Sequence, residues 1–303
     1  MTAQDINAKA LTYLSNGDWT NAQALLFENA KRFPSYQTYN NLGYFLITEG
    51  LTCKNGKSRN ALNLGVKYLQ GSSELKSTAV NLCALVKYVD YKLRGADESG
   101  KPALYSYACE CLKRALLLEY TDELQYNFLL FSYMAESGDR SIVGELRELL
   151  NKFVAPESVS LYFEALRHHS MIDEGLECIG RYGDFLDEVD LLMFYAKCGA
   201  YENGYQLCDA VYRNFIISPH VAAAIIECCT GTSRPEEARK YASLIKESAE
   251  SGYPRRKNQL KEVLADPDAP IPYRKALIAE YKCAPSMIER CCYFGCKEHG
   301  VSW

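Results

Sequence analysis

Five residues of types that bind metal ions lie close together near the C-terminal end of the sequence: Cys283, Cys291, Cys292, Cys296 and His299. If Cys291 is used in preference to its neighbour, the gaps between the ligands are seven, four and two residues. Thiolates and imidazole are ligands that zinc prefers, and four of them can surround one ion as a tetrahedron. Such an ion would also stabilise a short segment that has few large aliphatic side chains. The sequence therefore leaves open whether the tail holds reduced thiols without a cofactor, which is the favoured interpretation, or a structural zinc site.

The same tail carries Tyr293, Phe294 and Gly295 between its cysteines, and in this it resembles a CCCH zinc finger. In that family aromatic rings at such positions stack on the bases of single-stranded RNA. The resemblance therefore implies RNA binding by the tail. The sequence departs from the family at the last gap, where Lys297 and Glu298 alone separate the final two ligands and the family usually has one residue more.

The charge of the whole chain, −4, excludes a surface that is basic throughout, so a dedicated binder of duplex DNA is not expected. Residues 251–303 differ from the rest, with nine Lys and Arg against six Asp and Glu, hence +3. Cysteines total 13, an odd number spread over the chain, which indicates reduced thiols in the cytoplasm. Neither a signal peptide nor an apolar stretch long enough to span a membrane is recognisable, so no membrane partner is expected.

Short catalytic motifs are missing from the sequence. It contains no G-x-G-x-x-G, G-x-S-x-G, H-E-x-x-H or C-x-x-C pattern. Gly56, Lys57 and Ser58 match the end of a phosphate-binding loop, but five residues separate them from Gly50 where the motif has four. We therefore predict that the protein is not an enzyme. The alternative is a catalytic site assembled from residues far apart in the sequence, which leaves no short motif.

Apolar residues recur with a helical period throughout the chain, and alternating strand-like segments are nearly absent. The clearest unit opens the sequence: a helix over 6–14, a turn at Asn16, Gly17 and Asp18, and a second helix over 20–33 that Pro34 ends. Small residues recur in the later second helices with partners four and seven residues on, which places the three side chains on one stripe. These triplets are Ala108, Leu112 and Ala115; Gly204, Cys208 and Val211; and Ala238, Ala242 and Ile245.

Over residues 5–248 this pattern resembles the tetratricopeptide repeat, a helical hairpin of about 34 residues. The matching residues are Leu42 and Gly43, the turn Gly17, Asp18 and Trp19, the small residues Ala22, Ala61, Ala108, Gly204 and Ala238, and Pro34. The resemblance implies an all-α, right-handed solenoid of stacked antiparallel hairpins. We divide the chain into a repeat array at 1–248, capping helices at 249–282 and the Cys- and His-rich tail at 283–303.

The resemblance also implies that residues of the first helices line a concave groove. In this sequence those positions include Asn40, Tyr44, Lys87, Tyr88 and Met193. Relatives that bind a terminal carboxylate use a Lys and Asn clamp, and this set is incomplete here, so that ligand is not predicted.

The favoured function is a non-enzymatic scaffold or adaptor that binds a protein or peptide in this groove. The alternative from another class is a nucleic-acid-associated regulator that uses the basic C-terminal segment. An intracellular sensor of small signalling peptides is a third interpretation.

Overall fold

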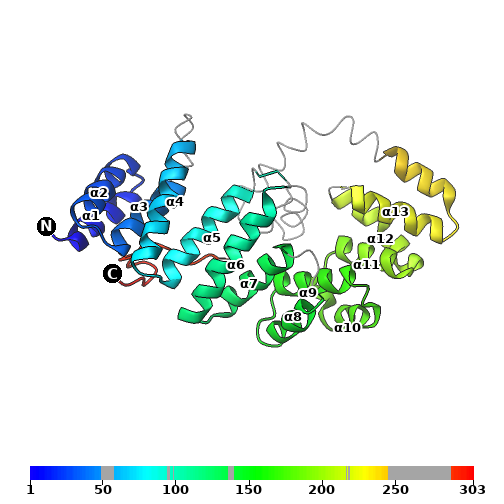
Figure 1. The fold of residues 1–303 in the computed structure, drawn as a ribbon. Coiled ribbons are helices and arrows are strands. Elements are labelled where there is room, and N and C mark those ends of the chain that lie inside the picture. The colour runs from blue at the N-terminus through cyan, green and yellow to red at the C-terminus, as the bar shows by residue number, and fades with distance from the viewer. Residues whose placement is uncertain are drawn as a thin grey trace. The chain divides into compact units, whose positions relative to one another are not determined.

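The computed structural model describes residues 1–48, 58–93, 96–97, 99–135, 140–215, 217, 219–244 and 288–303. Throughout these residues the regular structure is helical, and none of them belongs to a β-strand, so the all-α prediction is confirmed for this part of the chain (Figure 1). Within the described ranges, no helix combines the length and apolar character that crossing a bilayer requires. The chain divides into two compact units, one formed by Met1–Ala135 with Ser286–Trp303 and the other by Glu136–Pro285.

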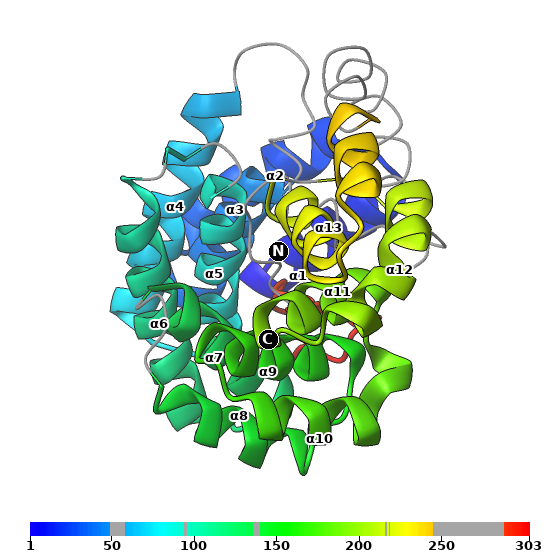
Figure 2. The same cartoon turned by 90° about the vertical axis from the view of Figure 1, so that its right-hand side faces the viewer.

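The N-terminal unit is a succession of helices in which each packs against the next along the chain (Figure 2). The first hairpin follows the predicted pattern. Thr2 caps its opening helix, since the Asp5 amide donates to the Thr2 hydroxyl at 3.2 Å and the Thr2 amide donates to the Asp5 carboxylate at 2.7 Å. The helices are α1 (Ala3–Ser15), α2 (Trp19–Arg32), α3 (Tyr36–Thr48), α4 (Ser58–Leu75), α5 (Ala79–Leu93), α6 (Lys101–Leu118) and α7 (Asp122–Ala135).

Small residues allow the paired helices of this unit to approach closely. A Cβ atom at Gly43 would lie 2.8 Å from the carbonyl oxygen of Gly65 and 2.9 Å from the amide nitrogen of Leu69. The backbones of α3 and α4 are therefore in contact, and Leu42 beside them is fully buried. Ala22 and Ala108, which the sequence predicts as small residues of second helices, are also fully buried, whereas Ala61 is partly exposed. Gly43 is thus a point of close backbone packing.

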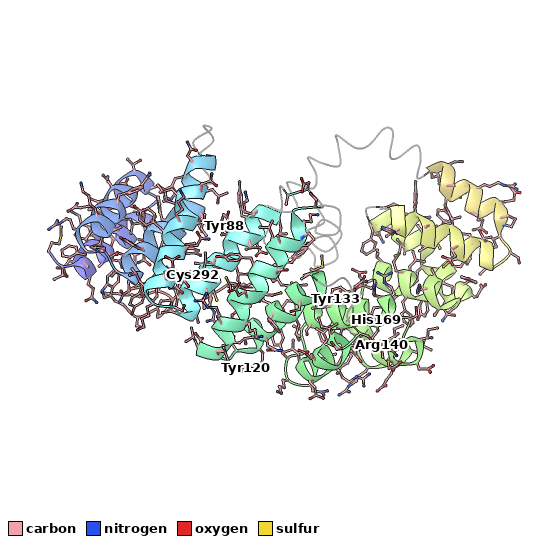
Figure 3. The ribbon with its side chains drawn as sticks, viewed as in Figure 1. Tyr88, Tyr120, Tyr133, Arg140, His169 and Cys292 are labelled. Atoms are coloured by element: carbon pink, nitrogen blue, oxygen red, sulfur yellow. The ribbon has the colours of Figure 1, made fainter. Side chains whose placement is uncertain are left out.

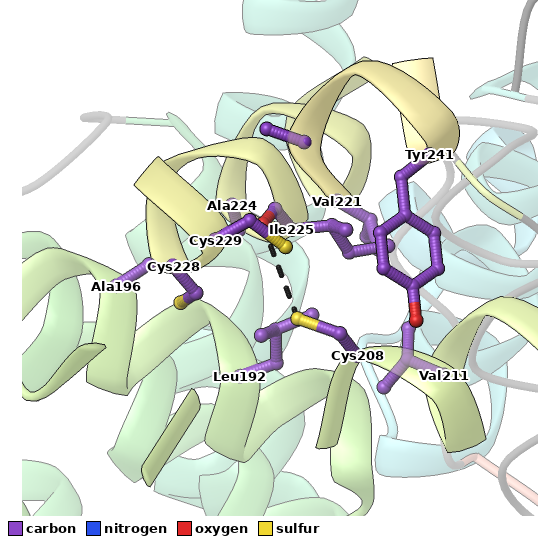
Figure 4. Packing of buried hydrophobic residues seen from close by; sticks show 11 residues of the cluster. Leu192, Ala196, Cys208, Val211, Val221, Ala224, Ile225, Cys228, Cys229 and Tyr241 are labelled. Carbon is purple, nitrogen blue, oxygen red and sulfur yellow. Dashed lines mark hydrogen bonds between the residues drawn. The ribbon is translucent and has the colours of Figure 1, made fainter. Parts of the chain in front are cut away.

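The second unit contains α8 (Ile142–Leu150), α9 (Pro156–His168), α10 (Ile172–Tyr182), the 3₁₀ turn η2 (Gly183–Phe185), α11 (Glu188–Cys198), α12 (Tyr201–Asn214), α13 (Pro219–Gly231) and helical residues 235–244. Its core includes Leu192, Val211 and Ile225 together with three buried thiols, those of Cys208, Cys228 and Cys229 (Figure 4). The Cys208 thiol donates to the carbonyl oxygens of Gly204 and Ile225 at 3.5 and 3.9 Å. Buried among aliphatic side chains, these cysteines act as small apolar residues.

Several sequence predictions fall outside the described residues. These are the capping helices at 249–282, residues 52–57 of the first inserted loop, and Cys283 at the start of the tail. Residues 288–303 of the tail are described, and they belong to the same compact unit as the N-terminal helices.

Replacement of Gly43 by alanine tests the close approach of α3 and α4. We expect Gly43→Ala to lower the free energy of unfolding by ~1–3 kcal/mol, because the methyl group must push two helix backbones apart. Gly71→Ala on α4 is the matched control. Its new Cβ would lie 3.6 Å from the nearest atom, on the Tyr39 ring, so we expect no loss or a gain of ~0.5–1 kcal/mol. Guanidinium unfolding followed by circular dichroism measures both, and equal stability of the two variants would contradict the packing described.

Candidate functional site

The C-terminal tail lies along one side of the N-terminal unit, where it contacts alternate helices. Figure 1 draws it in red beside the blue and cyan helices. Its partners come from α1, α3, α5 and α7 and from the segment that precedes α7. We call this surface the N-terminal groove and define it by Asn7, Tyr36, Asn40, Asn41, Tyr44, Lys87, Glu119 and Glu123.

Three buried asparagines hold the backbone of the tail. Asn40 donates to the Cys292 carbonyl at 2.6 Å, and Asn7 donates to the Phe294 carbonyl at 2.9 Å. Asn41 makes two bonds to one residue: it accepts from the Phe294 amide at 2.7 Å and donates to the Phe294 carbonyl at 2.8 Å. Each of the three asparagines is at most 1% exposed. These bonds engage groups that nearly every residue carries, so they favour an extended segment without selecting its side chains.

Lys87 adds a charged donor to the same set. Its ammonium group donates to the Arg290 carbonyl oxygen at 2.7 Å and to the Tyr44 hydroxyl at 3.3 Å. It also lies 5.5 Å from the centre of the Tyr44 ring, within the range of a cation–π contact. A hydrogen bond from a charged donor is stronger than one between neutral groups.

Arg290 supplies an ionic contact at one end of the groove. Its guanidinium contacts the carboxylates of Glu119 at 3.0 Å and Glu123 at 3.3 Å, and it donates to the Thr121 hydroxyl at 3.3 Å. The Glu123 carboxylate also accepts from the Glu289 amide at 2.9 Å. Since the Arg290 side chain is 21% exposed, solvent screens this network only in part. A positive side chain is therefore selected at this position.

Aromatic contacts supply a second side-chain preference. Phe294 is 6% exposed, and its ring meets the Tyr36 ring edge to face with centroids 5.4 Å apart. The Tyr293 ring meets Tyr44 in the same manner at 4.6 Å, and its hydroxyl lies 3.4 Å from that of Thr48. Edge-to-face pairs of this kind add to the free energy of burying the rings. The rings of Tyr293 and Phe294 thus both face the groove.

The predicted ligands of the tail separate into two environments. The thiol of Cys291, the thiol of Cys296 and a ring nitrogen of His299 lie within 4.8 Å of one another, so the three could hold a metal ion. Cys296 Sγ is 3.2 Å from His299 Nδ1. Cys292 lies outside this group because neighbouring residues of a non-helical segment direct their side chains to different sides. Its thiol is fully buried and donates to the Arg290 carbonyl, and burial raises its pKa to about 12.

A tight turn brings the three ligands together. The Cys296 amide donates to the Tyr293 carbonyl at 3.3 Å, the Val301 amide to the Cys296 carbonyl at 3.0 Å, and the Gly295 amide to the Val301 carbonyl at 3.0 Å. Gly295 has a φ of +77°. A Cβ atom there would lie 2.7 Å from Asn7 Nδ2, so glycine is needed both for the turn and for its contact with α1.

A cavity of about 320 Å³ adjoins the metal-ligating group. One wall is apolar, with Leu11 and Leu14, and two tyrosine rings contribute to the lining. The carboxylates of Glu289 and Glu298 are also part of the lining. The cavity therefore borders both the tail and the first helix.

Of the five predicted groove residues, Asn40, Tyr44 and Lys87 contact the tail. Tyr88 follows Lys87 on α5 (Figure 3), and its phenol is partly buried, which raises its pKa. Met193 belongs to the second unit, where it packs against the core that contains Leu192.

Five further residues of the groove were not selected from the sequence for this role: Asn7, Tyr36, Asn41, Glu119 and Glu123. Asn7 and Asn41 offered a recognisable signal, because each is a polar residue beside a fully buried apolar one, Ile6 or Leu42. The two glutamates offered none, since acidic residues at helix ends usually lie in solvent.

No protein-family model matches the chain, and the curated proteins contain no match to it. The groove, the tail and the metal-ligating group are therefore the features of this chain that indicate a function.

The glycine of the tail turn provides a test of the docked arrangement. We expect Gly295→Ala to increase alkylation of Cys292 by about tenfold or more, because the methyl group would overlap Asn7 and loosen the tail. Gly300→Ala is the matched control, since Gly300 also has a positive φ, +64°, but no atom lies within 4 Å of its new Cβ. Both variants lose ~1–2 kcal/mol of stability because alanine disfavours the positive φ at these positions. Mass spectrometry after timed alkylation gives the rates; identical behaviour of the two variants would contradict this contact.

Proposed function

We propose that the protein is a peptide-binding adaptor whose N-terminal groove receives an extended segment of another protein. The observation that carries the proposal is the manner in which residues 290–294 are held. Buried amides and Lys87 bind backbone atoms of this segment, and Arg290 and Phe294 supply side-chain contacts. A free peptide would be bound in the same way, with its backbone held by the asparagines and Lys87 and its side chains selected at the positions of Arg290 and Phe294. The tail would then be an internal ligand that occupies the groove.

We also propose that the helices form a right-handed solenoid of the tetratricopeptide type. Two observations support this. Each helix of the N-terminal unit packs against the next, and alternate helices contribute the residues of the groove. Gly43 lies at a backbone contact, as the repeat pattern requires. In such a solenoid the first helices line the concave face, which is the surface that binds partners.

Zinc is the ion that we propose for the metal-ligating group of Cys291, Cys296 and His299. Two sulfur ligands and one imidazole favour a borderline-soft ion, and zinc takes this combination with tetrahedral geometry. Three protein ligands leave one position to fill, and Cys283, which the sequence predicts as a ligand, lies outside the described residues. We propose a reducing compartment such as the cytoplasm, since all cysteines among the described residues are free thiols.

The RNA-binding alternative is less well supported by the position of the aromatic rings. Stacking on bases would require the faces of Tyr293 and Phe294 to be accessible. Both rings pack against tyrosines of the groove, and Phe294 is almost fully buried. A peptide ligand does not require the rings of Tyr293 and Phe294 to be accessible, because the peptide would displace the whole tail and occupy its place in the groove.

Direct binding of a labelled peptide tests the adaptor function. The probe has the sequence of residues 288–295 with Cys291→Ala and Cys292→Ala, and the protein is the full chain with Arg290→Glu and Phe294→Ala, which weakens the hold on the tail. We expect saturable binding by fluorescence anisotropy, and we expect a further Asn41→Ala change to weaken it by about tenfold or more, since two hydrogen bonds are lost.

Asn29→Ala is the matched control for that experiment. Asn29 is a buried asparagine of α2 that donates to the Ala3 carbonyl at 2.9 Å and is not part of the groove. Its replacement should lower stability and leave the peptide affinity unchanged. Absence of binding to the folded double variant, or equal effects of the two asparagine changes on affinity, would refute the peptide-binding role of the groove.

A further inference from the structure

The metal-ligating group is continuous with the part of the tail that lies in the groove. Cys291 stands between Arg290 and Cys292, whose carbonyl oxygens accept from Lys87 and Asn40 at 2.7 and 2.6 Å. Cys296 follows the docked residue Phe294 by two positions. One ligand is thus inside the groove-bound run, and the other two lie immediately after it.

We propose that zinc bound by Cys291, Cys296 and His299 holds the tail in the N-terminal groove and so controls access of a peptide to it. The inference rests on the proposed function, because it concerns competition for the same groove. The expected partner is an extended peptide in which an arginine is followed four residues later by a phenylalanine. Those are the positions of Arg290 and Phe294, the two side chains that the groove contacts most specifically.

The physical basis is the loss of freedom in the undocked tail. A metal ion that joins Cys291 to Cys296 closes a loop around Cys292, Tyr293 and Phe294. The His299 ligand fixes the following turn, in which the Gly295 amide already donates to the Val301 carbonyl and the Val301 amide to the Cys296 carbonyl, both at 3.0 Å. Closing the loop before docking removes conformational entropy that docking would otherwise have to overcome, so the metal-bound tail competes better for the groove.

Two features link the ion to the groove. Gly295, inside the metal-closed turn, is in contact with Asn7, and Asn7 donates to the Phe294 carbonyl. Because linkage is reciprocal, a docked tail must also raise the affinity for zinc by the same factor that zinc raises docking. A peptide that displaces the tail would consequently weaken zinc binding.

The experiment uses the reduced full chain and titrates it with zinc and with the labelled peptide described above. Zinc binding is measured alone by isothermal titration calorimetry, and peptide binding by anisotropy with either zinc or a chelator present. We expect one zinc ion per chain and a peptide affinity about tenfold or more weaker in zinc than in chelator. The double variant Arg290→Glu and Phe294→Ala should bind the peptide equally well in both conditions, because its tail no longer competes.

Variants of the ligands separate the metal effect from unfolding. Cys296→Ser and His299→Ala change half-buried or exposed residues, and each should abolish the zinc effect while peptide binding in chelator persists. Cys198→Ser is the matched control, a half-buried thiol of α11 outside the site, and it should retain the zinc effect.

The outcomes distinguish this inference from the proposed function. Absence of zinc binding, or zinc binding with no change in peptide affinity, would overturn the inference and leave the adaptor role intact. Failure of the folded double variant to bind the peptide would overturn the adaptor role itself. Persistence of the zinc effect in both Cys296→Ser and His299→Ala would show that the ion acts elsewhere, and the assignment of these ligands would be wrong.

Discussion

The pair of hydrogen bonds between the Asn41 carboxamide and the backbone of Phe294 is the constraint on which the site depends. Asn41 is fully buried, and so are its neighbours Asn7 and Asn40. A buried amide without hydrogen-bond partners lowers the stability of the fold by about 1–3 kcal/mol. Three buried asparagines on one face therefore require a neighbouring segment that offers several donors and acceptors. The tail backbone supplies most of these partners, and Asn41 also donates to Asn7 at 2.6 Å, whereas the buried Asn40 Oδ1 has no hydrogen-bond partner in the described part of the chain. The groove is therefore built to hold an extended segment.

Affinity and selectivity in this groove come from different contacts. The asparagines and Lys87 bind atoms common to all peptides, which provides binding without discrimination. Discrimination comes from the ends of the docked run, where Arg290 meets two carboxylates and Phe294 meets the Tyr36 ring. The ionic end remains partly solvated and so contributes modestly to stability, whereas the aromatic end is buried. A groove of this kind tolerates variation in the residues between the two ends.

Cysteine serves two distinct purposes in the molecule. In the second unit, Cys208 and Cys228 fill small spaces between helices, and their thiols are shielded from solvent. In the tail, Cys291 is close to Cys296 and His299, whereas the adjacent Cys292 is buried and protonated at neutral pH. Whether a tail thiol can act as a metal ligand depends on the side of the backbone to which it points. Cys291 points toward the other ligands, whereas the adjacent Cys292 is buried.

Local periodicity and side-chain size were enough to predict the helical class, the first hairpin and the packing positions of Gly43 and Ala108. The resemblance to a helical repeat also pointed to Asn40, Tyr44 and Lys87, which contact the tail, although their role in binding a partner stays a prediction. The folded chain was needed to show that the tail meets these residues and that Cys291 is grouped with Cys296 and His299 while Cys292 is not. The Asn40 to Cys292 bond joins residues 252 positions apart. Spacing along a chain carries no information about such a contact, since its formation depends on the path of the whole intervening polypeptide.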